Sequence, residues 1–405
     1  MNTIRLSDLK FSTIEKVAIA FYFLVEINAE LFAYRAIYIA SVAMLILTFL
    51  MKGGLRFYNN RYIGFMLLWL LAVVFSLFYT ESERGTSSAV MTVAVRTLVF
   101  SSFIYRVRSY RLLNSVFNII LFVSFVNTLF LITMVDLAAL GQERLGHTTL
   151  DEKWNANAIG LQLSFCVFII AYLKFKHINA GFTNNFTTIC ALLFIVVILL
   201  TGSRKSLFLL VLPTVMYYML TGKTSNIQKR LLIVIIAVFL LYQIVMSIEP
   251  LYNILGSRVE NLINSMGGNE AQDGSISSRR GLIEMGMVWF TQRPLLGYGM
   301  NSFEELSGRA TGMYWYSHNN FVELLVGVGI VGFVCYYLYY YYILRQSLHK
   351  QYREWAFGLS MVISILITEY GLVSWKNFMV QFILAIIFIQ ININKRYSYI
   401  AYENE

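Results

Sequence analysis

Hydrophobic residues along the chain gather into long stretches separated by short polar segments. Most of these stretches approach the about 17–25 apolar residues that an α-helix needs to cross a bilayer. Their length and their lack of period-two alternation favour helices over strands. The pattern predicts an all-α integral membrane protein with about twelve transmembrane helices. The twelve stretches lie near 17–34, 36–51, 62–79, 88–105, 112–134, 155–173, 186–201, 206–221, 231–248, 318–344, 354–372 and 375–393.

The composition excludes a soluble domain. Hydrophobic residues make up 58% of the 405 residues and charged residues only 13%, against about a quarter charged in ordinary globular chains. With the N-terminus placed inside the cell, 19 Lys and Arg fall in inner segments and 7 in short outer connections. This bias predicts that both termini are cytoplasmic. It also accounts for most of the net charge of +10, so we expect no nucleic-acid partner.

One connection is far longer than the others. Residues 249–317 form a 69-residue segment on the predicted outer face, and such long connections are usually functional. Within it we expect a helix over 279–292, capped by Ser277 and Ser278, ended by Pro294 and lying in the membrane interface. The chain is thus expected to divide into 1–248 with nine spans, the loop 249–317, and 318–405 with three spans and a cytoplasmic tail.

Ionisable residues at the predicted outer boundary are the candidates for chemistry. They are Arg204, the pair Arg279 and Arg280, and His318. Each has an ordinary explanation, namely a snorkelling helix end, a solvated loop or a polar helix start. Their occurrence together on one face is better explained by a site. The sequence has no Walker loop and no His/Cys cluster with metal-ligand spacing, so we expect no cofactor and no metal.

One reaction needs this set of side chains. When a polyprenyl diphosphate leaves a sugar, negative charge develops on the diphosphate, and guanidinium groups bind phosphate oxygens bidentately at any working pH. The attacking sugar hydroxyl must lose a proton, and imidazole, with an ordinary pKa of about 6.5, can accept it near neutral pH. The residues therefore predict glycosyl transfer from a lipid diphosphate.

Four segments resemble a known family. SSRRGLIEMGMVWFTQRPLLGYGMNSF at 277–303 and SHNNFVELLVGVGIVGF at 317–333 look like the signature of the O-antigen ligase and Wzy O-antigen polymerase superfamily. TGSRKS at 201–206 and NANAIG at 155–160 are weaker matches. The resemblance implies a helical glycosyltransferase of the GT-C type, metal-independent and inverting. Its donor would be an undecaprenyl-diphosphate-linked oligosaccharide, used outside the bacterial cytoplasmic membrane.

The resemblance also implies residue roles. Arg204 and Arg279 would bind the donor diphosphate, with Arg280 as the less certain neighbour, and His318 would be the general base. Asn319 or Asn320 would support the imidazole, although a helix-start role is equally compatible. Outside this set, Arg96 lies within the fourth apolar stretch, where a charge is costly. It is expected either to line the substrate pocket or to pair with Glu26, Glu30 or Glu369. Glu323 lies five residues past His318, off its helical face.

Three functions remain open at this stage. The first is a polymerase that joins lipid-linked repeat units into O-antigen, capsule or exopolysaccharide, with a chain-length regulator as a candidate partner besides membrane lipids. The second is a ligase that transfers the finished glycan to lipid A-core or another acceptor. The third, a lipid-linked oligosaccharide flippase, is disfavoured by the single long outer loop and by the lack of an inverted repeat.

Overall fold

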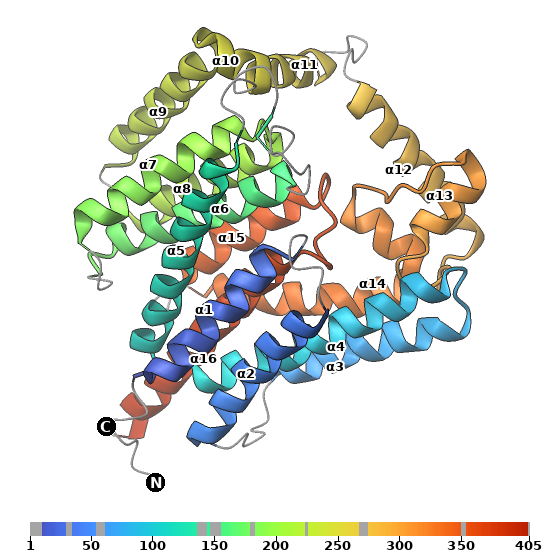
Figure 1. The fold of residues 1–405 in the computed structure, drawn as a ribbon, viewed down its shortest axis with the longest axis horizontal. Helices are drawn as coiled ribbons and strands as arrows, with labels where there is room; N and C mark the ends of the chain where they lie inside the picture. The colour runs from blue at the N-terminus through green and yellow to red at the C-terminus, as the bar shows by residue number, and fades with distance from the viewer. Residues whose placement is uncertain are drawn as a thin grey trace. The chain divides into compact units, whose positions relative to one another are not determined.

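Helices account for nearly all of the chain that the computed structural model describes (Figure 1). Each of the twelve predicted apolar stretches overlaps a helix, which confirms the all-α prediction. The helices divide between two compact units, unit 1 (Met1–Gly54 and Val107–Glu270) and unit 2 (Leu55–Arg106 and Ala271–Glu405). The structure describes residues 10–29, 35–53, 61–135, 144–145, 155–178, 183–222, 226–266, 274–349 and 354–403.

Unit 1 is built around a helix that is buried along most of its length. This helix, α6, packs against α7 and α8, and α1 packs against α2 and α5. Gln162 of α6 donates to Ser124 of α5 at 3.0 Å inside this core, so these two buried polar groups satisfy each other. The helices are α1 (Thr13–Ile27), α2 (Arg35–Gly53), α5 (Tyr110–Thr133), α6 (Ala156–Phe175), α7 (Asn184–Leu200), α8 (Arg204–Thr221), α9 (Ile227–Ser247), α10 (Glu249–Leu251) and α11 (Ser257–Met266).

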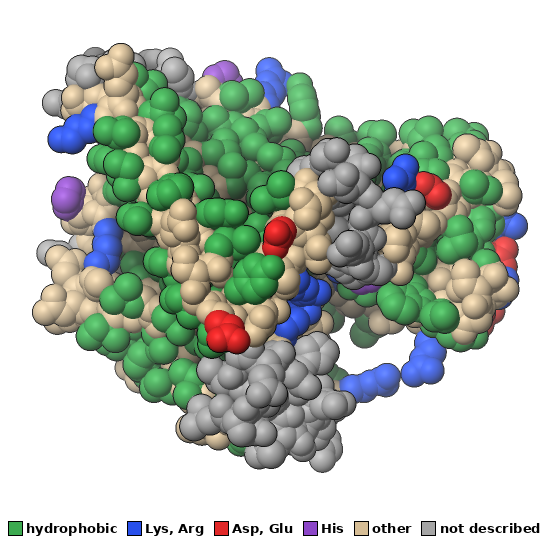
Figure 2. All heavy atoms as spheres, turned by 90° about the horizontal axis from the view of Figure 1, so that it is seen from above, with side chains coloured by type: hydrophobic (Ala, Val, Ile, Leu, Met, Phe, Trp, Pro, Cys, Tyr) green, Lys and Arg blue, Asp and Glu red, His purple; other side chains and the backbone are tan. Residues whose placement is uncertain are grey.

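Helix α9 shows why this fold needs a membrane. Its sequence is strongly apolar, yet Val245 is its one buried residue. Leu232, Ile235 and Phe239 are each more than half exposed. A helix that is apolar on all sides and uncovered by protein is stable only when lipid covers it. Figure 2 shows the same property more widely, because hydrophobic side chains cover most of the face in view and charged side chains are sparse.

The number of crossings can be compared with the prediction. Among the described residues, seven helices are long and apolar enough to cross a bilayer, namely α3 extended to Phe78, α4, α5, α6, α9, α14 and α16 up to Lys395. Three shorter apolar helices, α2 up to Met51, α7 and α15, accompany them. The chain is therefore a multi-pass membrane protein. Crossings by α1, α2, α7, α8 and α15, which the count of about twelve requires, stay predictions.

Unit 2 contains the second half of the predicted signature. Helix α14 packs against α3, α12 and α15, and α16 packs against α4. Leu282 of α12, Phe303 of α13 and Val322 of α14 share one buried apolar cluster. The elements are α3 (Arg61–Phe75), the 3₁₀ turn η2 (Ser76–Phe78), α4 (Glu83–Arg106), α12 (Gly274–Gln292), α13 (Phe303–Thr311), α14 (Asn320–Ser347), α15 (Trp355–Thr368) and α16 (Phe378–Glu403).

Helix α12 corresponds to the helix expected over 279–292, with one correction. It ends at Gln292, two residues before Pro294, as predicted. It begins at Gly274, so Ser277 and Ser278 lie inside the helix, and the prediction that they cap it was wrong. The position of α12 in the membrane interface stays a prediction.

Helix α14 is broken at Gly329, and the segment after α12 fills the break. Gly329 has φ of +61°, outside the helical range. The backbone N–H of Ile330 donates to the carbonyl of Pro294 at 2.9 Å, and the N–H of Tyr298 donates to the carbonyl of Val326 at 2.8 Å. A Cβ on Gly329 would lie 2.3 Å from the carbonyl carbon of Leu295. Only glycine permits this approach, so the break fixes α12 against α14.

Candidate active site

The predicted arginine junction in unit 1 is a tight turn between two helices. Helix α7 ends at Leu200, and Ser203 caps α8, accepting from the N–H of Ser206. Gly202 has φ of +58°, and a Cβ on it would lie 2.6 Å from the carbonyl oxygen of Ile254. Arg204 is thus the first residue of α8 and is half-buried. A cation at a helix N-terminus is opposed by the helix dipole, whereas an anion there is stabilised.

Two further arginines reach the same turn. Arg144 donates from Nε to the carbonyl oxygen of Thr201 at 2.8 Å and from Nη2 to Oδ1 of Asn157 at 3.3 Å. Arg258 donates to the carbonyl oxygen of Gly202 at 3.0 Å, and its own carbonyl oxygen accepts from Arg204 at 3.1 Å. Three guanidinium groups therefore surround the N-terminus of α8. Such a concentration of positive charge is suited to a polyanion.

In unit 2, His318 lies in a strained turn immediately before α14. Its φ of +57° places it in the left-handed region, which costs a non-glycine residue on the order of 1–3 kcal/mol. The hydroxyl of Ser317 donates to the carbonyl oxygen of Asn319 at 2.7 Å and accepts from the Asn319 N–H at 3.2 Å. These bonds on both sides of His318 hold the turn. Backbone strain of this kind clusters at functional sites.

A buried carboxylate also holds this turn. Oε2 of Glu323 accepts from the N–H of Ser317 at 3.0 Å. Glu323 is only 1% exposed, and its other oxygen makes no hydrogen bond to any residue that the structure describes. Burying a carboxylate oxygen without a partner costs stability. This oxygen can therefore bond with a group other than the residues that the structure describes.

Positive and aromatic side chains cluster around the imidazole. The ring centroid of Tyr316 lies 4.0 Å from that of His318. Burial raises the pKa of Tyr316, and the positive charge of Arg279 lowers it to a smaller extent, so Arg279 acts on the same pocket as the imidazole. Lys376 lies 4.9 Å above the Tyr316 ring and pairs with Glu304 at 3.4 Å. The structure thereby brings Arg279, Lys376 and His318 around one tyrosine.

The two asparagines after His318 have structural hydrogen bonds. Asn319 caps α14, since its Oδ1 accepts from the N–H groups of Phe321 and Val322 at 2.9 and 3.1 Å. Asn320 accepts from the N–H groups of Ser374 and Trp375 at 3.0 and 3.2 Å. These bonds support the helix-start role for Asn319 and fix the connection between α15 and α16 beside the site. Direct support of the imidazole by either residue stays a prediction.

Two predicted arginines are placed differently from the rest. Arg280 is exposed and pairs with Glu284 one turn along α12 at 3.2 Å, an arrangement worth little energetically. Arg96 donates to the carbonyl oxygen of Trp375 at 3.2 Å. The expected acidic partner of Arg96 is not found in the part of the chain that the structure describes, from which Glu30 is missing. A carbonyl, instead of a carboxylate, satisfies this intramembrane charge.

Several residues of these two clusters are absent from the sequence-based prediction. Arg144, Arg258 and Lys376 are ordinary loop cations in sequence, far from the turns that they reach. Arg204 belongs to unit 1, whereas Arg279, Arg280 and His318 belong to unit 2. The prediction that one cavity contains all of them therefore stays a prediction. Within unit 2, Arg279 and His318 are both near Tyr316, and their shared role stays a prediction.

Comparison with protein families identifies one match. Residues 189–337 match the family described as O-antigen ligase. The matched range contains both clusters' central residues, from the turn at Arg204 to α12 and the His318 turn. No curated protein matches the chain.

Proposed function

Since residues 189–337 carry an O-antigen ligase family domain, we propose that this membrane protein polymerises undecaprenyl-diphosphate-linked oligosaccharide repeat units into O-antigen, capsule or exopolysaccharide. The observation that carries the proposal lies in unit 2, where Arg279 and the imidazole of His318 are both near Tyr316. Arg144, Arg204 and Arg258 surround the N-terminus of α8, and Arg279 accompanies His318. The reaction would take place outside the cytoplasmic membrane, with both termini inside.

The proposed step is an inverting displacement at the anomeric carbon of the donor. A hydroxyl oxygen of the acceptor sugar forms the new C–O bond while the bond from the anomeric carbon to the diphosphate oxygen breaks. The electron pair of the broken bond leaves with the diphosphate, where Arg204 and Arg279 would stabilise the charge. The hydroxyl proton passes to the imidazole of His318. Free undecaprenyl diphosphate and a longer glycan are the products.

Neighbouring groups would support these roles. Lys376, 4.9 Å above the Tyr316 ring, adds a second cation on the diphosphate side of the imidazole. Glu323 holds the N–H of Ser317 and so keeps His318 in its left-handed conformation. The set needs no divalent ion for charge neutralisation, because guanidinium and ammonium groups carry the positive charge themselves. Activity should therefore persist in EDTA.

The second candidate is a ligase that moves the finished glycan to lipid A-core or another acceptor. The description of the matched family favours it directly. The chemistry at the donor is the same in both cases, and only the acceptor differs. A strain that lacks the gene separates the two. Loss of a polymerase leaves single repeat units attached to the cell surface, whereas loss of a ligase leaves long glycans attached to the carrier lipid.

The enzyme itself can be tested in purified form. The protein is reconstituted in nanodiscs with undecaprenyl-diphosphate-linked repeat units, and glycan length is followed by gel and mass spectrometry. We expect longer glycans and released undecaprenyl diphosphate. Transfer only to added lipid A-core would favour the ligase. Movement of the lipid-linked glycan across vesicles without any new glycosidic bond would show a flippase and contradict the proposal.

A further inference from the structure

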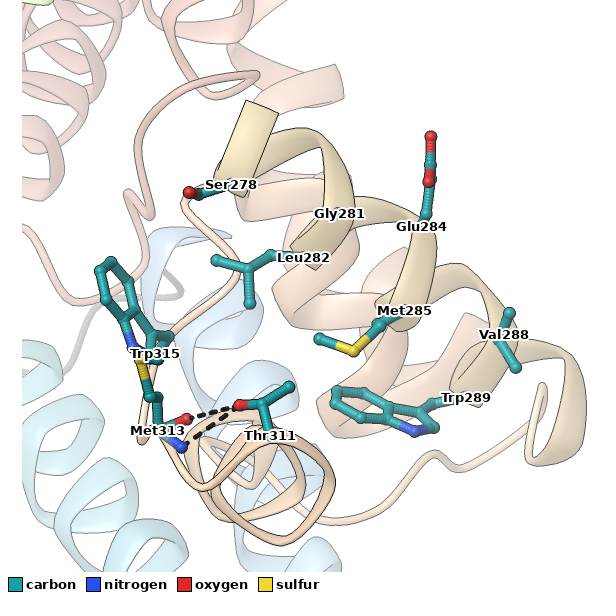
Figure 3. Close-up of a pocket in the computed structure, with 10 residues that line it drawn as sticks. All are labelled: Ser278, Gly281, Leu282, Glu284, Met285, Val288, Trp289, Thr311, Met313 and Trp315. Carbon is teal, nitrogen blue, oxygen red and sulfur yellow. Dashed lines mark hydrogen bonds between the residues drawn. The ribbon is translucent and has the colours of Figure 1, made fainter. Parts of the chain in front are cut away.

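Unit 2 contains a cavity beside the His318 turn that none of the assigned roles uses. It has a volume of about 580 Å³, within the range of pockets that bind small molecules of several rings. Figure 3 shows Trp289 and Trp315 at opposite sides of it, with Leu282 and Met285 between them. The lining residues are Ser278, Gly281, Leu282, Glu284, Met285, Val288, Trp289, Thr311, Met313 and Trp315.

One wall of the cavity is a single face of α12. Ser278, Leu282, Met285 and Trp289 recur at spacings of three and four residues, which places them on one side of a helix. The opposite wall is the segment that runs from the end of α13 to the His318 turn. Met313 and Trp315 on this segment are 58% and 44% exposed. Large apolar side chains that remain accessible around a cavity mark a binding site.

The cavity lies next to the candidate active site. The indole of Trp315 has its ring centroid 6.5 Å from that of His318, and Ser278 directly precedes Arg279 on α12. A molecule in the cavity would therefore extend from the proposed base along α12. In the proposed reaction, the group next to the base is the acceptor, because its hydroxyl gives up the proton.

We propose that this cavity binds the sugar rings of the acceptor glycan, with the indoles of Trp289 and Trp315 as apolar platforms; this inference rests on the proposed function. A pyranose ring has an apolar C–H face and a rim of hydroxyls, so it fits a site that combines aromatic faces with a few polar groups. Ser278, Glu284 and Thr311 supply such polar groups around the apolar wall.

The isoprenoid chain of a lipid diphosphate is the competing occupant. An apolar chain would favour walls without charge, since desolvating an ion pair is costly. Here Glu284 lines the cavity and pairs with Arg280 at 3.2 Å, both largely exposed to solvent. The hydroxyl of Thr311 also lies at the cavity. These groups favour a hydrated ligand such as a glycan.

Binding can be measured separately from turnover. The full-length protein in nanodiscs is titrated with the free oligosaccharide repeat unit, released from its lipid, and in a second series with farnesyl diphosphate, both followed by saturation-transfer NMR. We expect Trp315→Leu to weaken oligosaccharide binding about tenfold, equivalent to about 1.4 kcal/mol, and Trp315→Phe to retain most of it. Farnesyl diphosphate binding should be unchanged in both variants. Tyr314→Leu is the matched control, because Tyr314 is 69% exposed and does not line the cavity.

Trp289→Leu gives a second, independent test from the other wall. Its ring also contacts Phe303 at 5.2 Å, so its thermal unfolding is compared with wild type before binding is measured. Added undecaprenyl diphosphate, the carrier lipid without a glycan, should leave the oligosaccharide signal in place; displacement would assign the cavity to the carrier lipid and overturn the acceptor assignment. If the tryptophan variants lost binding of farnesyl diphosphate but kept binding of the oligosaccharide, the cavity would be a lipid groove and the proposal would be overturned.

The same measurements separate this inference from the proposed function. The purified protein could bind the oligosaccharide through the two tryptophans and yet form no glycosidic bond. That result would support the cavity as a glycan site and contradict the polymerase. The wild-type protein could instead polymerise normally while Trp315→Leu and Trp289→Leu bind the oligosaccharide as well as wild type does. That result would support the polymerase and overturn the assignment of the cavity.

Discussion

Glu323 accepts a hydrogen bond of 3.0 Å from the backbone N–H of Ser317, so a carboxylate of α14 holds the residue that precedes His318. Glu323→Ala removes this acceptor and leaves a buried N–H unsatisfied, which should lower the free energy of unfolding by about 1–3 kcal/mol. Glu323→Gln retains an acceptor oxygen and should fall between wild type and Glu323→Ala in both stability and transfer activity. Thermal unfolding measures the order of the variants in stability, and the nanodisc assay measures their order in transfer activity. Glu305→Ala, which removes a partly exposed pair with Arg309, should change little.

His318 combines a strained backbone with the proposed proton acceptor, so stability and activity should separate there. His318→Gly removes the strain at φ of +57° and should leave the unfolding temperature unchanged or raise it, with a gain of up to about 1 kcal/mol. His318→Ala keeps the strain. Both variants should lose transfer activity by at least about 100-fold, the contribution typical of a general base. Activity near wild type in His318→Gly would contradict the assigned role.

The helices of this protein follow from its sequence, but the turns that build its site do not. Apolar stretches predicted where the helices lie, because a bilayer requires a minimum apolar length, although α1 ends at Ile27, before the predicted 34, and α16 continues to Glu403, past the predicted 393. The break at Gly329 is invisible in that pattern, since Val326, Val328 and Ile330 continue the apolar run on both sides. Only the approach of the Pro294 and Leu295 carbonyls explains it. A contact between distant segments determines this turn.

The same reason limits the prediction of the site. Helical spacing places Glu323 away from His318, but Ser317 and His318 precede the helix, so the carboxylate reaches back to them. Lys376 is 58 positions beyond His318 and approaches it only because Asn320 binds the backbone of Ser374 and Trp375. Charge and motif spacing identified Arg204, Arg279 and His318. The residues that support them are brought into place by hydrogen bonds between distant segments, which no local sequence pattern indicates.

Arg279 and Arg280 are neighbours in sequence with different environments, which gives a matched pair of variants. Arg279 is half-buried and acts on Tyr316, whereas Arg280 is exposed and pairs with Glu284. Arg279→Lys should lower activity by at least about tenfold, because a single ammonium cannot reproduce the bidentate phosphate contact. Arg280→Lys should stay within about twofold of wild type. If Arg280→Lys lost more transfer activity than Arg279→Lys, the diphosphate contact would be assigned to Arg280.

Gly329→Ala tests whether the break in α14 positions α12. A Cβ there would lie 2.3 Å from both the carbonyl carbon and oxygen of Leu295 and would occupy a left-handed conformation. We expect a loss of stability on the order of 1–3 kcal/mol and a loss of activity, because the helix that carries Arg279 must shift. Gly281→Ala is the matched control on α12 itself, since a Cβ at Gly281 meets no atom within 4 Å. Equal unfolding temperatures for the two variants would contradict the positioning role.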